Sequence, residues 1–92
     1  MEFTVYGHEI ISGSDVGMHY DASLESSKMQ AAAYRAALRQ LDPSGPPLGT
    51  LAIYELLLQM PDVPIMISLL NSPQSIFSEC LIARRVVAFL ID

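Results

Sequence analysis

Residues 23–41 read SLESSKMQAAAYRAALRQL, and this stretch decides the fold class because it has the composition and period of an amphipathic helix. Asp21 or Ser23 supplies a side-chain oxygen for the N-cap, and Glu25 places a negative charge where the helix dipole favours it. An apolar stripe about 100° wide recurs with the helical period and predicts the face that packs on a sheet. Its members are Leu24, Ala31, Tyr34, Leu38 and Leu41. We therefore expect a helix over the whole stretch, ended by Asp42 and the proline-rich segment that follows it.

Upstream of this helix, the sequence predicts a β-hairpin. Residues 2–11 begin with a near alternation of β-forming side chains, which suits a half-buried strand. Residues 12–17 read SGSDVG and are rich in turn formers, and residues 16–20 suit a second short strand. The predicted fold class is α+β: an N-terminal hairpin, an amphipathic helix packed on a small, mainly antiparallel sheet, and additional short helices.

Downstream of the long helix, the sequence predicts further helices. A second helix is expected from residue 48 or 50 to residue 60, because leucine and tyrosine recur there at helical spacing. Residues 64–70 form a short apolar run that fits a buried helix and a buried strand equally well. Residues 73–83 suit another helix, with Ser72 as its cap and Pro73 at its first position.

The last apolar segment, residues 84–91, reads RRVVAFLI and leaves two structures open. Its density of β-branched and aromatic side chains favours a strand that is buried on both faces and pairs with the N-terminal hairpin. The alternative is one helix over residues 73–90, apolar almost all round, which a partner subunit would have to cover.

Length and composition predict one domain over residues 1–92. A chain of 92 residues is too short for two independent cores, and 51% hydrophobic against 16% charged residues provides material for one core rather than for disorder. The apolar C-terminal third is interrupted by prolines and charged residues before it reaches the roughly 20 residues of a membrane span. We therefore expect no membrane association.

Cysteine usage and the first residues predict a cytoplasmic setting. Cys80 is the single cysteine and cannot form an internal disulfide. Residues 1–4 lack the basic and apolar regions that begin a signal peptide.

The charge of the chain argues against generic DNA binding, because a net charge of −5 repels phosphate backbones. All five basic residues lie in two places, one strip of the long helix and a pair near the C-terminus. These candidate binding residues are Lys28, Arg35, Arg39, Arg84 and Arg85. Their concentration suits contact with phosphate or with an acidic protein surface. The alternative is that they line the edge of the packed stripe and pair with Glu25 or Asp42.

The sequence predicts no catalytic constellation, no cofactor site and no metal site. The hairpin would bring His8 and His19 together, with Glu9 and Asp21 nearby, but their spacing matches no metal-ligand pattern. Cys80 has apolar neighbours and no histidine close in sequence, which indicates core packing.

The first 41 residues, a strand-turn-strand followed by an alanine-rich helix that opens at Asp21-Ala22-Ser23-Leu24-Glu25, resemble small proteins of phages and mobile elements. In size, acidity and opening pattern the chain is similar to anti-CRISPR inhibitors of type I surveillance complexes. The resemblance implies an inhibitor that occupies a protein or guide-RNA surface of a Cascade-type complex and blocks target DNA without catalysis. It supplies no functional residues that transfer to this sequence.

Three hypotheses about function follow. The first is a non-enzymatic binding protein, an inhibitor or adaptor that occludes a surface of a protein or ribonucleoprotein complex. The second is a structural homo-oligomer assembled through the apolar region of residues 63–92. The third is a small enzyme that uses His8, His19 or Cys80.

Overall fold

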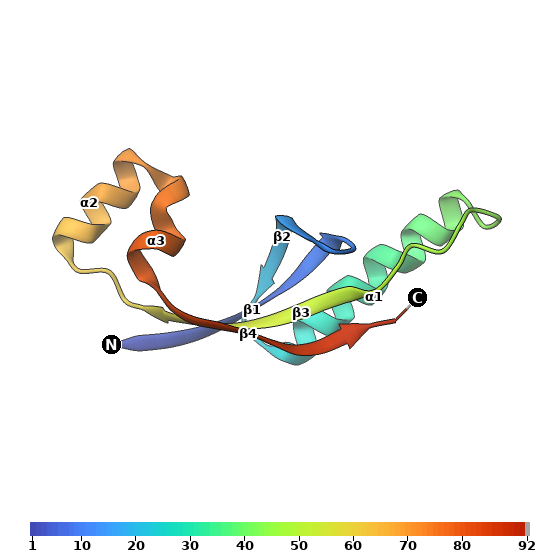
Figure 1. Cartoon of the computed structure of the whole chain (residues 1–92), viewed down its shortest axis with the longest axis horizontal. Helices are drawn as coiled ribbons and strands as arrows, with labels where there is room; N and C mark the ends of the chain where they lie inside the picture. Colours follow the sequence, from blue (N-terminus) through green and yellow to red (C-terminus); the bar gives the residue numbers. More distant parts are fainter. Residues whose placement is uncertain (92) are drawn as a thin grey trace.

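The computed structural model describes residues 1–91, except for the side chains of Asp15 and Val16, and has an α+β fold (Figure 1). Its elements follow the chain in the order β1 (Glu2–Ile11), β2 (Ser14–Asp21), α1 (Leu24–Leu41), β3 (Leu51–Gln59), α2 (Val63–Asn71), η1 (Pro73–Ser75), α3 (Ile76–Cys80) and β4 (Leu81–Leu90). The four strands form one antiparallel sheet in the order β2-β1-β3-β4. The predicted fold class, with its N-terminal hairpin and C-terminal strand, is confirmed.

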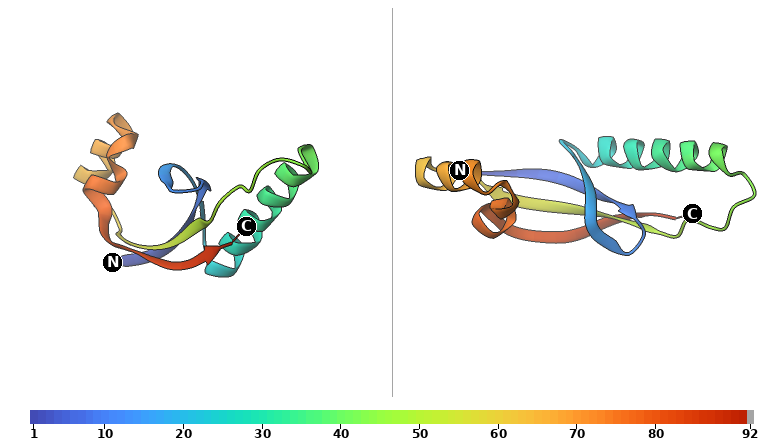
Figure 2. Two further views of the ribbon diagram at one scale, coloured as in Figure 1. Left: turned by 45° about the vertical axis from the view of Figure 1, so that its right-hand side comes forward. Right: turned by 90° about the horizontal axis from the view of Figure 1, so that it is seen from above.

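The helices lie at two opposite ends of the sheet (Figures 1 and 2). The long helix α1 packs on one end and contacts all four strands. The short helices α2 and α3 form a separate group at the other end and connect β3 to β4. The middle of the sheet therefore lies between two helical groups that do not cover it completely.

The hairpin of β1 and β2 is longer than expected. Its turn consists of Ser12 and Gly13, and Gly13 adopts a φ of 77°, which favours glycine because other side chains are strained there. The two strands pair from Ile11 and Ser14, next to the turn, to Tyr6 and Asp21. In this register His8 lies opposite His19. The expected proximity of the two histidines is confirmed.

Helix α1 has the expected bounds, and its cap is Ser23, whose Oγ accepts a hydrogen bond from the backbone N–H of Ser26 at 3.1 Å. The predicted apolar stripe is only partly correct. The buried positions are Ser27, Ala31 and Arg35, whereas Tyr34 is 42% exposed and Leu41 is 83% exposed. The helix is rotated so that Ser27 contacts His8. Its C-terminal end projects beyond the strands (Figure 2), which leaves Leu41 exposed.

The helix predicted from residue 48 or 50 to residue 60 is wrong, because Leu51–Gln59 forms the strand β3. β3 lies between β1 and β4; Leu51, Ala52 and Ile53 are buried on both faces of the sheet, and Leu56 and Leu58 are buried farther along the strand. A central strand of this kind carries an almost continuous apolar run, and such a run also satisfies a helical stripe. Burial between two neighbouring strands overrides the helix propensity of its leucines.

Residues 63–80 are helical except for Ser72. Asp62 caps α2 by accepting a hydrogen bond from the backbone N–H of Ile65 at 3.0 Å, so the open question at residues 64–70 is settled as a helix. The helix expected over residues 73–83 begins at Pro73 as the short η1 and ends at Cys80. It ends early because Leu81 already pairs with Leu58 in the sheet.

The C-terminal segment is a strand, and the alternative of one helix over residues 73–90 is wrong. Two details of the prediction are also wrong. β4 pairs with β3 rather than with the hairpin, and it lies at the edge of the sheet, where none of its residues is buried. The apolar side chains that suggested a strand buried on both faces are therefore largely exposed.

The molecule is elongated and has little core. It measures 51 × 24 × 18 Å, and its radius of gyration is 15.3 Å, against about 12 Å for a compact domain of this length. The accessible surface is 6107 Å², against about 5,300 Å² for a folded monomer of this mass. Few hydrophobic side chains are buried: Ala31, Leu51, Ala52, Ile53, Leu56, Leu58 and Cys80.

Candidate functional site

An open groove lined by aromatic and aliphatic side chains lies between α3 and the hairpin. We call it the aromatic groove. One hollow of about 290 Å³ is entirely apolar and is lined by Phe3, Val5, Tyr20, Leu58, Ile76 and Phe77. A second hollow of about 170 Å³ shares Tyr20 and Phe77 with the first and adds Met18, Leu56, Leu81 and Arg84. The groove thus gathers residues from both ends of the sequence onto one surface.

The groove lies on the face of the sheet opposite α1. Val5 and His8 are three residues apart in β1, so their side chains point to opposite faces, and His8 is the one that contacts α1. Across the groove, the rings of Tyr20 on β2 and Phe77 on α3 lie 5.9 Å apart between centroids. This contact joins the hairpin to the helical group while both rings stay about 40% exposed, at 42% and 40%.

A glycine in β1 makes room for one wall of the groove. A Cβ atom on Gly7 would lie 2.8 Å from Cδ1 of Tyr20 and 3.0 Å from Cε of Met18. The absence of a side chain at Gly7 therefore lets the Tyr20 ring lie over the backbone of β1.

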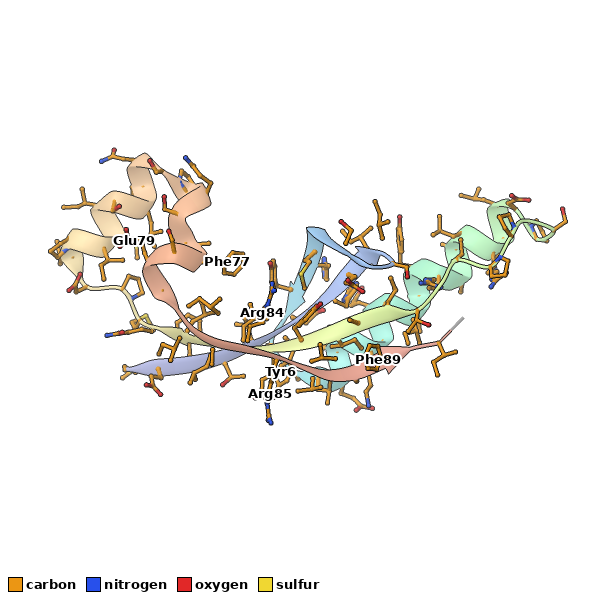
Figure 3. The ribbon with its side chains drawn as sticks, in the orientation of Figure 1. Tyr6, Phe77, Glu79, Arg84, Arg85 and Phe89 are labelled. Carbon is orange, nitrogen blue, oxygen red and sulfur yellow. The ribbon has the colours of Figure 1, made fainter. Side chains whose placement is uncertain are left out.

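Arg84 is the charged residue of the groove. Its side chain points into the space between α3 and β2 (Figure 3), and its guanidinium carbon lies 5.0 Å from the centroid of the Tyr54 ring. Such a cation–π contact holds the guanidinium over the sheet. Aromatic rings around an arginine are the composition found at the most strongly contributing positions of protein interfaces.

Arg85, the neighbour of Arg84, lies on the other face of the sheet (Figure 3). Its Nε donates a hydrogen bond to Glu55 at 2.9 Å, and the hydroxyl of Tyr6 donates one to the same carboxylate at 3.1 Å. The hydrogen bond from Arg85 lowers the pKa of Glu55, and the carboxylate raises the pKa of Tyr6 and of Arg85. The two adjacent arginines therefore belong to different surfaces.

The three basic residues of α1 lie apart from the groove. Lys28 is exposed, whereas Arg35 is only 8% exposed. Arg35 and Arg39 line a hollow of about 280 Å³ beside Leu90 and Ile91, at the C-terminal end of β4. The five predicted binding residues are thus divided between α1, the aromatic groove and the opposite face of the sheet.

A polar cluster lies between the hairpin and the start of α1. His8 is 3% exposed, and its Nδ1 lies 3.3 Å from Oγ of Ser27 and 3.8 Å from Asp21. His19 lies 3.4 Å from the same carboxylate, and the two imidazole rings are 5.3 Å apart between centroids. Burial lowers the pKa of His8, the nearby His19 lowers it further, and Asp21 opposes both effects.

The side chains considered for catalysis do not form one site. Cys80 is buried with Leu56 and Leu58, on the groove side of the sheet, whereas His8 faces α1. Within residues 1–91, leaving aside the side chain of Asp15, no group of three or more histidine, cysteine, aspartate or glutamate side chains could hold a metal ion.

Sequence reasoning missed the aromatic groove. Phe3, Tyr20 and Phe77 come from three distant segments, and none of them belongs to a motif with a recognisable spacing. Only the sheet topology brings them together. The available signal was the excess of apolar residues over what so short a chain can bury.

Among the helices of residues 1–91, none is both long enough and apolar enough to cross a membrane. Comparison of the chain with protein-family models, with curated proteins and with solved structures finds no match.

Proposed function

We propose that this chain is a non-enzymatic binding protein that takes an apolar segment of a protein partner into its aromatic groove. The observation that carries the proposal is that Tyr20 and Phe77, each about 40% exposed, line both hollows of the groove, with Phe3 on one side of them and Arg84 on the other. Contiguous apolar patches of more than a few hundred Å² are rare on monomeric proteins and usually mark a binding site.

The chemistry of the groove indicates the kind of partner. The apolar floor favours aliphatic or aromatic side chains, and Arg84 favours a carboxylate at one point of the bound segment. The net charge of −5 disfavours a nucleic acid as the direct ligand. The partner is therefore a protein, alone or within a ribonucleoprotein complex, and the chain acts in the cytoplasm as an inhibitor or adaptor that occludes the surface it binds.

A narrower form of this proposal is inhibition of a type I CRISPR surveillance complex. It depends on the resemblance of residues 1–41 to anti-CRISPR proteins. Its test is the binding of target DNA by a purified type I complex with and without the chain. Inhibition of DNA binding would support the narrower form, and unchanged DNA binding would contradict it.

Affinity capture from a bacterial lysate, with and without nuclease, followed by mass spectrometry, tests the general proposal. We expect a stoichiometric protein partner with the wild-type chain and at least an approximately tenfold loss with Tyr20→Ala or Arg84→Ala, the effect typical of a central interface residue. Recovery of the chain without any partner would count against the proposal.

The matched control is Arg85→Ala, which removes the same charge one residue away but on the opposite face of the sheet. We expect this variant to retain the partner. If the groove variants retain the partner and the double variant Lys28→Glu with Arg39→Glu loses it, the binding surface lies on α1 instead. Arg35 is unsuitable for this comparison because its burial makes charge reversal a test of folding.

A further inference from the structure

The outer edge of β4 is long and apolar. The strand runs for ten residues at the edge of the sheet, and among residues 1–91 no strand pairs with its outer side. Ile82, Val86 and Phe89 are 47%, 44% and 63% exposed. Native proteins usually protect such edges with short strands, prolines, β-bulges or several charges, because an open edge is a template for another strand. In β4 the only charges are those of the adjacent Arg84 and Arg85.

We propose that β4 pairs antiparallel with β4 of a second copy of the chain, around a twofold axis that passes by Val86. The result is one continuous sheet to which each copy contributes four strands. This interface does not depend on the identity of any partner in the aromatic groove.

The register of β4 against β3 determines which side chains share a face. Leu56, Tyr54 and Ala52 are two residues apart along β3, and they pair with Arg84, Val86 and Phe89, so these three residues of β4 lie on one face. Arg85 and Ala88 lie on the other face, because their partners are Glu55 and Ile53. The register shift between Ile53 and Tyr54 leaves Val87 as a bulge, and a second shift between Leu57 and Leu58 leaves Ile82 as another.

A twofold axis at Val86 places every pair of opposed residues on the same face of the sheet. With the Val87 bulge repeated in each strand, Val86 lies opposite Val86, Arg85 opposite Ala88, and Arg84 opposite Phe89 of the second copy. Every opposed pair then shares a face, as antiparallel pairing requires. No arginine faces an arginine, and each Arg84 meets an aromatic ring. An axis between Arg84 and Arg85 would instead bring the like charges together.

The surface area of the chain fits a dimer of ordinary size. The accessible surface of 6107 Å² exceeds that of a folded monomer of this mass by about 800 Å². A standard protein interface buries about 800 Å² on each partner. This surplus includes both the aromatic groove and the β4 edge, and it is large enough to contain one interface of that size. A second copy is the natural occupant because the edge is complementary to itself under a twofold rotation.

Sedimentation equilibrium of the purified full chain is the first test. We expect twice the chain mass of 10.1 kDa for the wild type and the single mass for Val86→Lys, which places two lysines opposite each other at the axis. The matched control is Ile67→Lys, at an apolar side chain on α2 that is 53% exposed and distant from the edge. This control should remain a dimer. A monomeric wild type at about 100 µM, or a Val86→Lys chain that is still dimeric, would overturn the proposal.

Cross-linking tests the register and remains decisive if Val86→Lys fails to fold. The cysteine-free variant Cys80→Ser is the background, because Cys80 is the only native cysteine. Directly opposed residues of antiparallel strands have Cα atoms about 4.5–5.5 Å apart, within the range that a disulfide spans. In this background Val86→Cys should form a disulfide-linked dimer under mild oxidation, and Ile67→Cys should not. Equal cross-linking of the two, or none at position 86, would refute the pairing.

Discussion

His8 occupies a buried position between β1 and the beginning of α1, an unusual place for a histidine in a core this small. Burial holds its pKa below the usual 6.5, so the folded chain keeps this imidazole neutral at a pH where the unfolded chain already binds a proton. The stability that His8 contributes is therefore complete above about pH 6.5 and decreases as the pH falls through that value toward the lower pKa of the folded state.

We expect the free energy of unfolding in urea to fall between pH 7.5 and 5.5, with a slope from this one group of at most about 1.4 kcal/mol per pH unit. His8→Gln, which removes the titrating group, should flatten this part of the curve. His19→Gln should retain most of the fall, because burial is the larger cause of the shift at His8. An unchanged slope in His8→Gln would contradict this account.

At the residue scale, the sequence predicted contacts only where residues are near in the chain. The approach of His8 and His19 followed from a short hairpin and is confirmed. Adjacent residues of a strand point to opposite faces, so the division of Arg84 and Arg85 between two faces follows once β4 is known to be a strand. The sequence alone instead grouped them as one basic pair that binds at a single place. The aromatic groove could not be predicted, because Tyr20 and Phe77 meet only through the complete sheet.

At the scale of elements, α1 was predictable because its signals are local. The serine cap, the acidic first turn and the proline-rich end all act within a few residues of each helix terminus. β3 was not predictable, because its apolar run depends on burial between β1 and β4 rather than on its own period. For β4 the composition predicted the strand correctly but not its burial. β4 lies at the edge of the sheet, so its side chains are largely exposed.

The cap of α1 gives an element-scale prediction. Ser23→Ala removes the side-chain oxygen that accepts a hydrogen bond from Ser26, and we expect it to reduce the free energy of unfolding by about 1 kcal/mol. Ser44→Ala, in the exposed segment after the helix, should change it by less than about 0.5 kcal/mol. Urea denaturation followed by circular dichroism measures both. Equal effects of the two substitutions would show that the cap contributes nothing specific.

At the scale of the whole molecule, the surplus of exposed apolar surface connects the two proposals. The aromatic groove lies on one face of the sheet between α3 and the hairpin. β4 forms one edge of that sheet (Figure 1). Because strand pairing continues the sheet sideways, it leaves the apolar hollow at Phe3, Val5 and Ile76 of each copy open, while Phe89 of the second copy borders the groove at Arg84. A dimer would therefore present two grooves, and a partner with two copies of the bound segment would gain avidity from the pairing.

If folding is coupled to pairing of the β4 edges, the thermal stability of the chain depends on its concentration, because dilution favours the separated, unfolded chains. For two chains of this length the unfolding enthalpy is about 130 kcal/mol, so the melting temperature should rise by about 4 °C for each tenfold increase in concentration. Differential scanning fluorimetry from about 1 to 100 µM measures this dependence. Val86→Lys should melt at a lower and concentration-independent temperature, whereas Ile67→Lys should follow the wild type. A wild-type melting temperature that does not change with concentration would mean that the sheet is stable with its β4 edge open.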